Sequence, residues 1–241
     1  MHVILVILYE IKNGFMEYNN LNKIYKTDFL DLYHCDCMEL LRQTPDNYYS
    51  LALVDPPYGI GMGKGAGETR GNGKKKKDLY TPKTWDENKP TAEYWEQLFR
   101  VSKNQIVWGG NYFTKYLPES RGWFYWRKLM GGNYSDGELA WTSFDMILKE
   151  YTMRSEQGDK RFHPTQKPIQ LYDFCLKYCA KPNDLILDTH FGSGSIALAV
   201  DKANRLDKMN LHLTACEIDK EYIDKAIKRI SVSIKQGTLS F

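Results

Sequence analysis

The stretch Leu51-Ala-Leu-Val-Asp-Pro-Pro-Tyr58 indicates how this chain is organised. Its first four residues are apolar or small, which is typical of a buried strand in a parallel sheet whose two faces are both covered. The strand ends at Asp55, because the two prolines that follow lack an amide donor and fix φ. Ligands bind at the carboxyl ends of strands in open α/β sheets. We therefore expect Asp55 and Tyr58 to lie at the functional edge of an α/β fold.

The chain has 241 residues, of which 42% are hydrophobic and 26% charged, as in ordinary soluble proteins. This length suits one α/β domain, alone or with a small appendage. The longest apolar run, Val3 to Leu8, is too short to span a bilayer. We interpret it as an N-terminal strand, or as the result of a start placed upstream of the true one at Met16. No membrane segment is expected.

Five cysteines are an odd number and too few for a disulfide framework, which indicates a reducing, cytoplasmic setting. The spacings Cys35-x-Cys37 and Cys175-x-x-x-Cys179 do not match the common zinc pairs. Cys175 and Cys179 also fit one face of a helix. We predict that these cysteines are small buried side chains and that the protein holds no metal.

The net charge of +3 is unevenly distributed along the chain. Residues 64–77 carry six basic residues and one acidic residue, whereas the rest of the chain carries 27 basic and 29 acidic residues. Seven of the fifteen residues 59–73 are glycine, which predicts a mobile loop at 59–90. A lysine run is often only a solvated surface. Its position beside the Asp55 corner makes phosphate contacts with nucleic acid an equal alternative.

A second constellation lies near the end of the chain. The apolar strand 185–188 is followed by Gly192-x-Gly194, a helix, and a further strand that closes with Glu217. The glycines let the backbone approach a ligand, and an acid at the end of the next strand can bind ribose hydroxyls. With Ala197 the pattern also fits the dinucleotide fingerprint of dehydrogenases. Only 24 residues follow Glu217, however, so the other strands must come from upstream in a permuted order. A dehydrogenase also leaves Asp-Pro-Pro-Tyr unexplained.

The remaining patterns supply the other elements and the loops. We predict strands at 105–108, 122–126, 138–143 and 145–150, and helices at about 38–43, from 91, after Pro168, after Gly194 and at the C-terminus. The segments 127–137 and 151–163 are predicted surface loops.

Together, four motifs resemble the DNA amino-methyltransferases. They are Asp55-Pro-Pro-Tyr58, His163-Pro-Thr-Gln-Lys-Pro168, Asp188-x-x-Phe191-Gly-Ser-Gly194 and Glu217. Their order is similar to that of the beta group, in which the catalytic motif precedes the cofactor motif. The segments 108–111 and 138–143 also look like parts of that family, and the resemblance runs from about Leu32 to Ile230.

The resemblance implies a Rossmann-like α/β methyltransferase fold with a mixed seven-stranded sheet sandwiched by helices. We accordingly expect an N-terminal extension at 1–31 and a single methyltransferase domain at 32–241 with a small target-recognition region. It further implies that S-adenosylmethionine is the cofactor and double-stranded DNA the substrate. The implied cofactor residues are Asp36 near the adenine, Thr165 and Lys167 at the methionine end, Asp188, Phe191, Gly192 and Gly194 around the glycine turn, and Glu217 on the ribose.

The chemistry of methyl transfer fits the Asp55 corner. An aromatic amino group is a poor nucleophile because its lone pair is delocalised into the ring. Hydrogen bonds from its N–H groups to the Asp55 carboxylate and the Pro56 carbonyl would favour a tetrahedral nitrogen. Pro57 keeps the corner rigid, and Tyr58 would stack on the base after it is flipped out of the duplex. In the resembling family an aspartate at the first position points to adenine, whereas serine is more frequent in the cytosine enzymes.

Two features depart from the family pattern. Thr189-His190 stands where the family often has proline before the phenylalanine, and we interpret His190 and His163 as structural rather than catalytic. The segments available for reading DNA sequence (59–90, 127–137 and 151–163) are short, which predicts low specificity or a second subunit. The predicted DNA-binding residues are Lys64, Arg70, Lys74, Lys75, Lys76 and Lys77.

The alternatives left open are transfer to cytosine N4, to RNA or to a protein amide. From another class of function, a catalytically silent DNA-binding module also fits the lysine-rich loop. A homodimer and a restriction endonuclease partner are open as well.

Overall fold

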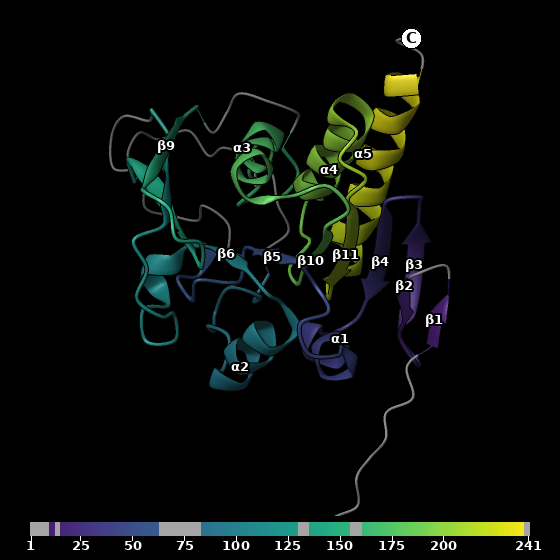
Figure 1. The fold of residues 1–241 in the computed structure, drawn as a ribbon, viewed down its shortest axis with the longest axis horizontal. Helices are drawn as coiled ribbons and strands as arrows, with labels where there is room; N and C mark the ends of the chain where they lie inside the picture. The colour runs from purple at the N-terminus through teal and green to yellow at the C-terminus, as the bar shows by residue number, and fades with distance from the viewer. Residues whose placement is uncertain (1–9, 13–14, 63–82, 130–134, 155–160, 239–241) are drawn as a thin grey trace, which may run out of the picture.

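The computed structural model describes residues 10–12, 15–62, 83–129, 135–154 and 161–238. A mixed sheet of nine strands forms the centre of these residues, in the order β3-β4-β11-β10-β5-β6-β8-β7-β9 (Figure 1). The strands are β3 (Asn22–Lys26), β4 (Leu30–His34), β5 (Leu51–Val54), β6 (Gln105–Trp108), β7 (Trp123–Arg127), β8 (Gly137–Thr142), β9 (Lys149–Thr152), β10 (Leu185–Asp188) and β11 (His212–Glu217). A separate hairpin joins β1 (Glu10–Lys12) and β2 (Phe15–Glu17).

Five neighbouring strands, β4, β11, β10, β5 and β6, run parallel at the centre of the sheet. The two edges are mixed: β3 is antiparallel to β4, β8 is antiparallel to both β6 and β7, and β9 is parallel to β7. The permuted order predicted from the sequence is thus present, because β10 and β11 from late in the chain lie between β4 and β5.

Helices cover both faces of the parallel strands, with α1 and α2 on one side and α3, α4 and α5 on the other (Figure 1). Their bounds are α1 (Cys37–Gln43), α2 (Ala92–Val101), α3 (Ile169–Cys179), α4 (Ser195–Asp207) and α5 (Lys220–Thr238), with a short 3₁₀ helix, η2, at Gly110–Tyr112.

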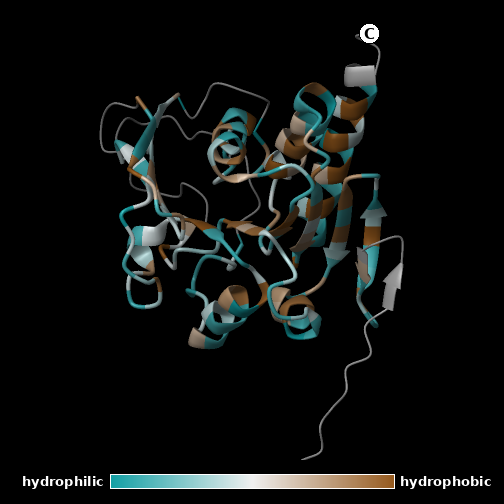
Figure 2. Ribbon diagram, in the orientation of Figure 1, coloured by the Kyte–Doolittle hydropathy of each residue, from teal (hydrophilic) through white to brown (hydrophobic). Residues whose placement is uncertain are grey.

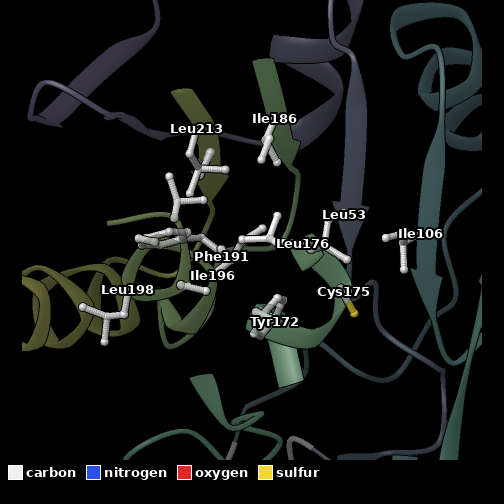
Figure 3. Close-up of a cluster of buried hydrophobic side chains, with 14 of the residues drawn as sticks. Leu53, Ile106, Tyr172, Cys175, Leu176, Ile186, Phe191, Ile196, Leu198 and Leu213 are labelled. Atoms are coloured by element: carbon white, nitrogen blue, oxygen red, sulfur yellow. The ribbon is translucent and has the colours of Figure 1, made fainter. Parts of the chain in front are cut away.

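The two faces of the sheet bury two separate apolar clusters. Successive side chains of a strand point to opposite faces. Leu51 and Leu53 of β5 therefore pack with α3, α4 and α5, whereas Ala52 and Val54 pack with α1 and α2. Figure 3 shows Leu53, Ile106, Ile186 and Leu213 from four strands beside Tyr172, Leu176 and Ile196. The apolar colouring of these central strands in Figure 2 reflects the same two-sided burial. Burial on both faces fixes β5, and with it the position of Asp55.

The predicted sheet of seven strands needs correction, since the described residues contain nine strands in the main sheet. The sheet also starts at β3, within the stretch 1–31 that we expected to be an extension. Strand β3 is a polar edge strand, and Lys23 from it forms an ion pair with the buried Asp31 at 3.3 Å. Such a strand has no apolar alternation for a sequence pattern to reveal. The strand predicted at 145–150 lies slightly later, at Lys149–Thr152.

Cys175 and Cys179 lie buried on α3, as the sequence predicted. Within the ranges that the structure covers, no helix is long and apolar enough to cross a membrane.

Candidate active site

Two cavities meet at the carboxyl end of β5. Their volumes are about 320 Å³ and about 600 Å³, within the usual range for small-molecule sites. The first lies at the glycine turn after β10, and we call it the glycine-turn cavity; the second lies on the side of Tyr58, and we call it the Tyr58 cavity. The two cavities have five lining residues in common: Asp55, Pro57, Trp85, Thr165 and Lys167. The predicted corner therefore forms the junction of two binding spaces.

Four of the predicted cofactor residues line the glycine-turn cavity alone: Asp36, Phe191, Gly192 and Glu217. The Glu217 carboxylate accepts hydrogen bonds from the Gly192 amide at 2.8 Å and the Asp219 amide at 2.9 Å. Asp36 caps α1 by accepting from the Met38 amide at 2.7 Å. These contacts fix both acids at the rim of the cavity.

The structure does not bring Asp188 and Gly194 to the wall of this cavity. Asp188 accepts a hydrogen bond from the His190 amide at 3.0 Å, which shapes the turn after β10. Gly194 has a φ of +71° and sits at the N-terminus of α4, where its conformation starts the helix. Both residues support the loop that carries Phe191 and Gly192.

Three aromatic rings that the sequence analysis did not assign to the site form part of the cavity wall. The Trp85 and His163 rings lie 5.4 Å apart, and the His163 and Tyr222 rings 4.2 Å apart, between centroids. Burial lowers the pKa of His163 to about 3, so its ring is neutral near pH 7. His163 is the first residue of the recognised motif 163–168, and that motif could have indicated its place in the site. Trp85 lies in a segment without a sequence pattern, so nothing in the sequence indicated its place.

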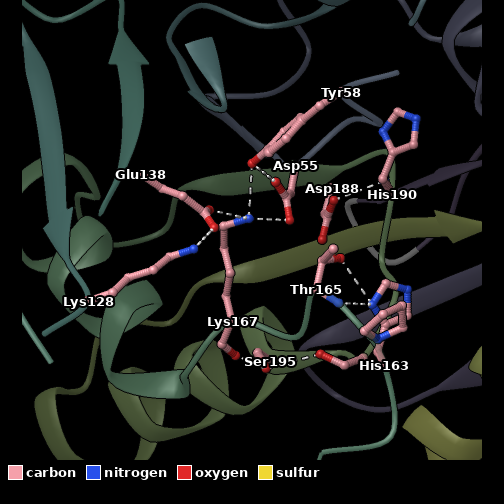
Figure 4. Close-up of polar contacts among 12 residues, drawn as sticks. Asp55, Tyr58, Lys128, Glu138, His163, Thr165, Lys167, Asp188, His190 and Ser195 are labelled. Carbon is pink, nitrogen blue, oxygen red and sulfur yellow. Dashed lines mark hydrogen bonds and ion pairs between the residues drawn. The ribbon is translucent and has the colours of Figure 1, made fainter. Parts of the chain in front are cut away.

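A buried network of four charges lies at the junction of the cavities (Figure 4). The Lys167 ammonium is ion-paired with the Asp55 carboxylate and lies 3.3 Å from Glu138 Oε2. Lys128 is ion-paired with the other oxygen of Glu138. Only 3% of the Lys167 side chain is exposed, and a buried ammonium requires such partners. Lys167 was expected at the methionine end of the cofactor, whereas Glu138 and Lys128 had no expected role.

The pKa values of the network follow from burial and from the neighbouring charges. Burial raises the pKa of Asp55, and the Glu138 charge adds to the rise while Lys167 opposes it. Burial acts in the same direction on Glu138, but Lys167 and Lys128 outweigh it and hold that pKa below its usual range. Burial disfavours the Lys167 cation, yet the two carboxylates raise its pKa. The neighbouring charges therefore favour the carboxylate form of Glu138 and the ammonium form of Lys167, whereas burial favours the protonated form of Asp55.

Tyr58 is held tightly above this network. Its hydroxyl donates to Asp55 Oδ1 at 2.7 Å and accepts a hydrogen bond from the Lys167 ammonium at 3.2 Å. Its ring stacks with Tyr112, with centroids 4.8 Å apart and 15° between the planes. A Cβ atom at Gly109, whose φ is +69°, would lie 2.2 Å from the Tyr58 ring. Only glycine at 109 permits this position of the ring.

The predicted DNA-binding residues Lys64, Arg70 and Lys74 to Lys77 lie outside the described residues. Both flanks of their segment are described. The buried Asp86 carboxylate accepts hydrogen bonds from the Gly59 amide at 2.9 Å and the Met62 amide at 2.8 Å. Asp86 therefore ties the residues before the basic segment to those after it.

Comparison with known families identifies the chain. The family model described as DNA methylase, which covers the N6 and N4 methylases, matches residues 106–228, just over half of the sequence. The chain therefore belongs to the N6/N4 DNA methylase family, as its motifs predicted. The matched range includes the segment 163–168, the glycine turn and Glu217. The Asp55 corner lies upstream of it.

Individual relatives agree with this assignment. The type II methyltransferase M.HinfI of Haemophilus influenzae is 25% identical over 146 residues, which are 61% of this chain and 37% of the relative. The chain spans between about a third and a half of the length of the curated relatives it matches.

Solved structures confirm the predicted methyltransferase fold. The cytosine-N4-specific PvuII DNA methyltransferase superposes with a TM-score of 0.60 at 14% identity, over 88% of this chain and 89% of that one. The M1.HpyAVI–SAM complex superposes with a TM-score of 0.52 at 19% identity, over 83% and 99% of the two chains.

Proposed function

We propose that this protein is an S-adenosylmethionine-dependent DNA methyltransferase that methylates the N6 amino group of an adenine flipped out of the duplex. The observation that carries the proposal is the junction of two cavities at Asp55 and Lys167. A transfer reaction needs a donor site and an acceptor site that open onto the same catalytic group. A module that only binds DNA does not need a second cavity there.

The residues of the glycine-turn cavity fit the proposed cofactor. Glu217 offers carboxylate oxygens at the end of β11, where ribose hydroxyls would be bound. Among the described residues of its wall, the acids Asp36, Asp55 and Glu217 outnumber the cation Lys167, which suits a ligand with a positively charged sulfonium. When bound, this cofactor supplies an electrophilic methyl group.

The Tyr58 cavity would hold the base. Asp55 would accept one N–H of the amino group and the Pro56 carbonyl the other, which frees the nitrogen lone pair. As the N–C bond forms, the bond between the methyl group and the sulfonium sulfur breaks and leaves a neutral thioether. One proton must then leave the nitrogen, and the Asp55 carboxylate would take it. Its raised pKa makes Asp55 a better proton acceptor than an exposed aspartate. Close positioning of the two reactants would supply much of the remaining rate enhancement.

Transfer to cytosine N4 is the second candidate. The good superposition with PvuII methyltransferase, a cytosine-N4 enzyme, supports it. Adenine and cytosine both present an amino group next to an unprotonated ring nitrogen. The Asp55 carboxylate by itself therefore does not discriminate between the two bases. The aspartate at the first motif position supports adenine. Three further points stay predictions: that the substrate is double-stranded DNA, that the protein forms a homodimer, and that it has an endonuclease partner.

Product analysis tests this proposal. Purified protein is incubated with methyl-labelled S-adenosylmethionine and, in parallel, with duplex DNA, RNA or a protein acceptor, and the modified DNA is digested to nucleosides. We expect label in DNA only, as N6-methyladenine. Label in N4-methylcytosine would move the function to the second candidate. Salt-sensitive DNA binding without any labelled product would favour the silent module.

Glycine at 109 provides a second test. We expect Gly109→Ala to displace the Tyr58 ring and to slow methyl transfer roughly 10²-fold, the usual result of a misplaced catalytic group. The comparison is Gly61→Ala: Gly61 has a similar φ of +74°, but a Cβ atom added there would meet nothing within 4 Å. Both substitutions place alanine at a positive φ and so strain the backbone similarly, but only Gly109→Ala brings a Cβ atom against the Tyr58 ring. Equal rates for the two would show that the Tyr58 position does not matter.

A further inference from the structure

Glu138 reaches the reaction centre from β8, whose segment 138–143 resembles the family but was assigned no catalytic role. It lies on β8, which is separated from β5 by β6 in the sheet. Its Oε2 atom is fully buried and, among the described residues, receives no hydrogen bond, although Lys167 Nζ lies 3.3 Å away. One oxygen of this carboxylate is therefore an unfilled acceptor that faces the Lys167 ammonium.

Both oxygens of Asp55 are already engaged. Oδ1 accepts from the Tyr58 hydroxyl, and Oδ2 contacts the Lys167 ammonium. An incoming amino group must compete with these donors for Asp55. Lys167 can withdraw only if another anion receives it, because a buried charge without a partner is strongly destabilising.

We propose that Glu138 is a positioning residue for methyl transfer, which takes over the Lys167 ammonium when Asp55 turns to the amino group of the substrate base. This inference rests on the function proposed above. The ammonium has three donors and already points between the two carboxylates, so a small rotation about its side-chain torsions completes the exchange. Lys128 is paired with the other oxygen of Glu138, so that oxygen stays compensated while Oε2 receives the Lys167 ammonium.

A purely structural role for Glu138 makes a different prediction about pH. The charged and titratable groups that face Asp55 are Lys167, Glu138, Tyr58, Asp188 and Tyr172. Of these, Glu138 raises the pKa of Asp55 through its negative charge. If Glu138 acts on Asp55, removal of this charge moves the ionisation of Asp55 to lower pH. A residue that only fills space would leave it in place.

The test is the single-turnover rate of methyl transfer by Glu138→Gln, measured across the acid range. We expect the plateau rate to fall about 10²-fold, because Lys167 stays on Asp55. The acid limb of the profile should move to lower pH, with the affinity for S-adenosylmethionine unchanged. Glu138→Asp, which keeps the charge, should restore the position of the limb. Glu150→Gln, on the edge strand β9, which β7 separates from β8, removes an exposed acid and should behave as wild type.

Two results would overturn the inference: a wild-type rate in Glu138→Gln, or a slower rate with an unmoved acid limb. If the single variant does not fold, the charge-balanced pair Glu138→Gln and Lys128→Met is measured instead, with the same expected shift. Wild-type protein without methyl transfer would refute the proposed function itself, which separates the two failures.

Discussion

Asp55→Ala is expected to reduce the single-turnover rate of methyl transfer roughly 10³-fold, the scale on which single acid–base or charge-stabilising groups act. The carboxylate is the one acidic group among the residues that line both cavities, and it would orient the amino group and take its proton. The change also removes the nearest counterion of Lys167. That ammonium would then pair with Glu138 alone and leave the amino group without an anionic acceptor.

Binding of S-adenosylmethionine should persist in Asp55→Ala, because most of the glycine-turn cavity is built by other residues. Calorimetry or a thermal shift with the cofactor measures this. Asp55→Asn retains an oxygen acceptor and should lose less activity than the alanine variant. Asp224→Ala, at an exposed site on α5, serves as the matched control. Transfer at the wild-type rate in Asp55→Ala would exclude the mechanism, even if the protein proved to be a methyltransferase.

The Asp55 corner and the glycine turn were predictable because their signals are local. An apolar run, an acid and two prolines specify where β5 ends, and Gly192-x-Gly194 after Asp188 specifies the turn into α4. The rule that ligands bind at the carboxyl ends of parallel strands then brings both motifs to one edge of the sheet. Neither step requires knowledge of which strands are neighbours.

Glu138 and Trp85 were not predictable in the same way, because their roles depend on contacts that are distant in the sequence. Glu138 meets Lys167 only because β8 turns back antiparallel beside β6. Trp85 reaches both cavities from an irregular segment with no periodic pattern. The edge strand β3 was missed for a related reason: its polar residues pair with charges and with β4 instead of filling the core. Polar residues that lie at the ends or edges of elements therefore limit what the sequence alone can show.

Asp188→Asn is expected to stabilise the protein above about pH 4, by an amount that grows with pH up to about pH 8. Asp188 is 2% exposed, and the polar contact that its side chain makes is with the His190 amide. Burial raises its pKa to about 8, and the charges of Asp55 and Glu217 add to the rise. The ordinary pKa of aspartate is near 4, so the unfolded chain has released this proton above about pH 4. The folded protein still holds the proton on Asp188 at those pH values. Between these two values, the free energy of unfolding falls as pH rises.

Asparagine has the same shape, accepts the same hydrogen bond and carries no charge, so the variant should lose this pH dependence. The gain should reach about 5 kcal/mol near pH 8, because the two pKa values differ by roughly four units of about 1.4 kcal/mol each. It is measured by chemical denaturation at a series of pH values from about 5 to 8. His163 and His190 act in the opposite direction, because burial lowers their pKa values to about 3 and about 4 and stability is lost as pH falls below about 6.5. Both histidines remain in the variant, so the difference between variant and wild type isolates Asp188. Asp207→Asn, at the exposed end of α4, should show no such trend. A constant difference across the range would mean that Asp188 is ionised in the folded protein, held by polar contacts instead of by a proton.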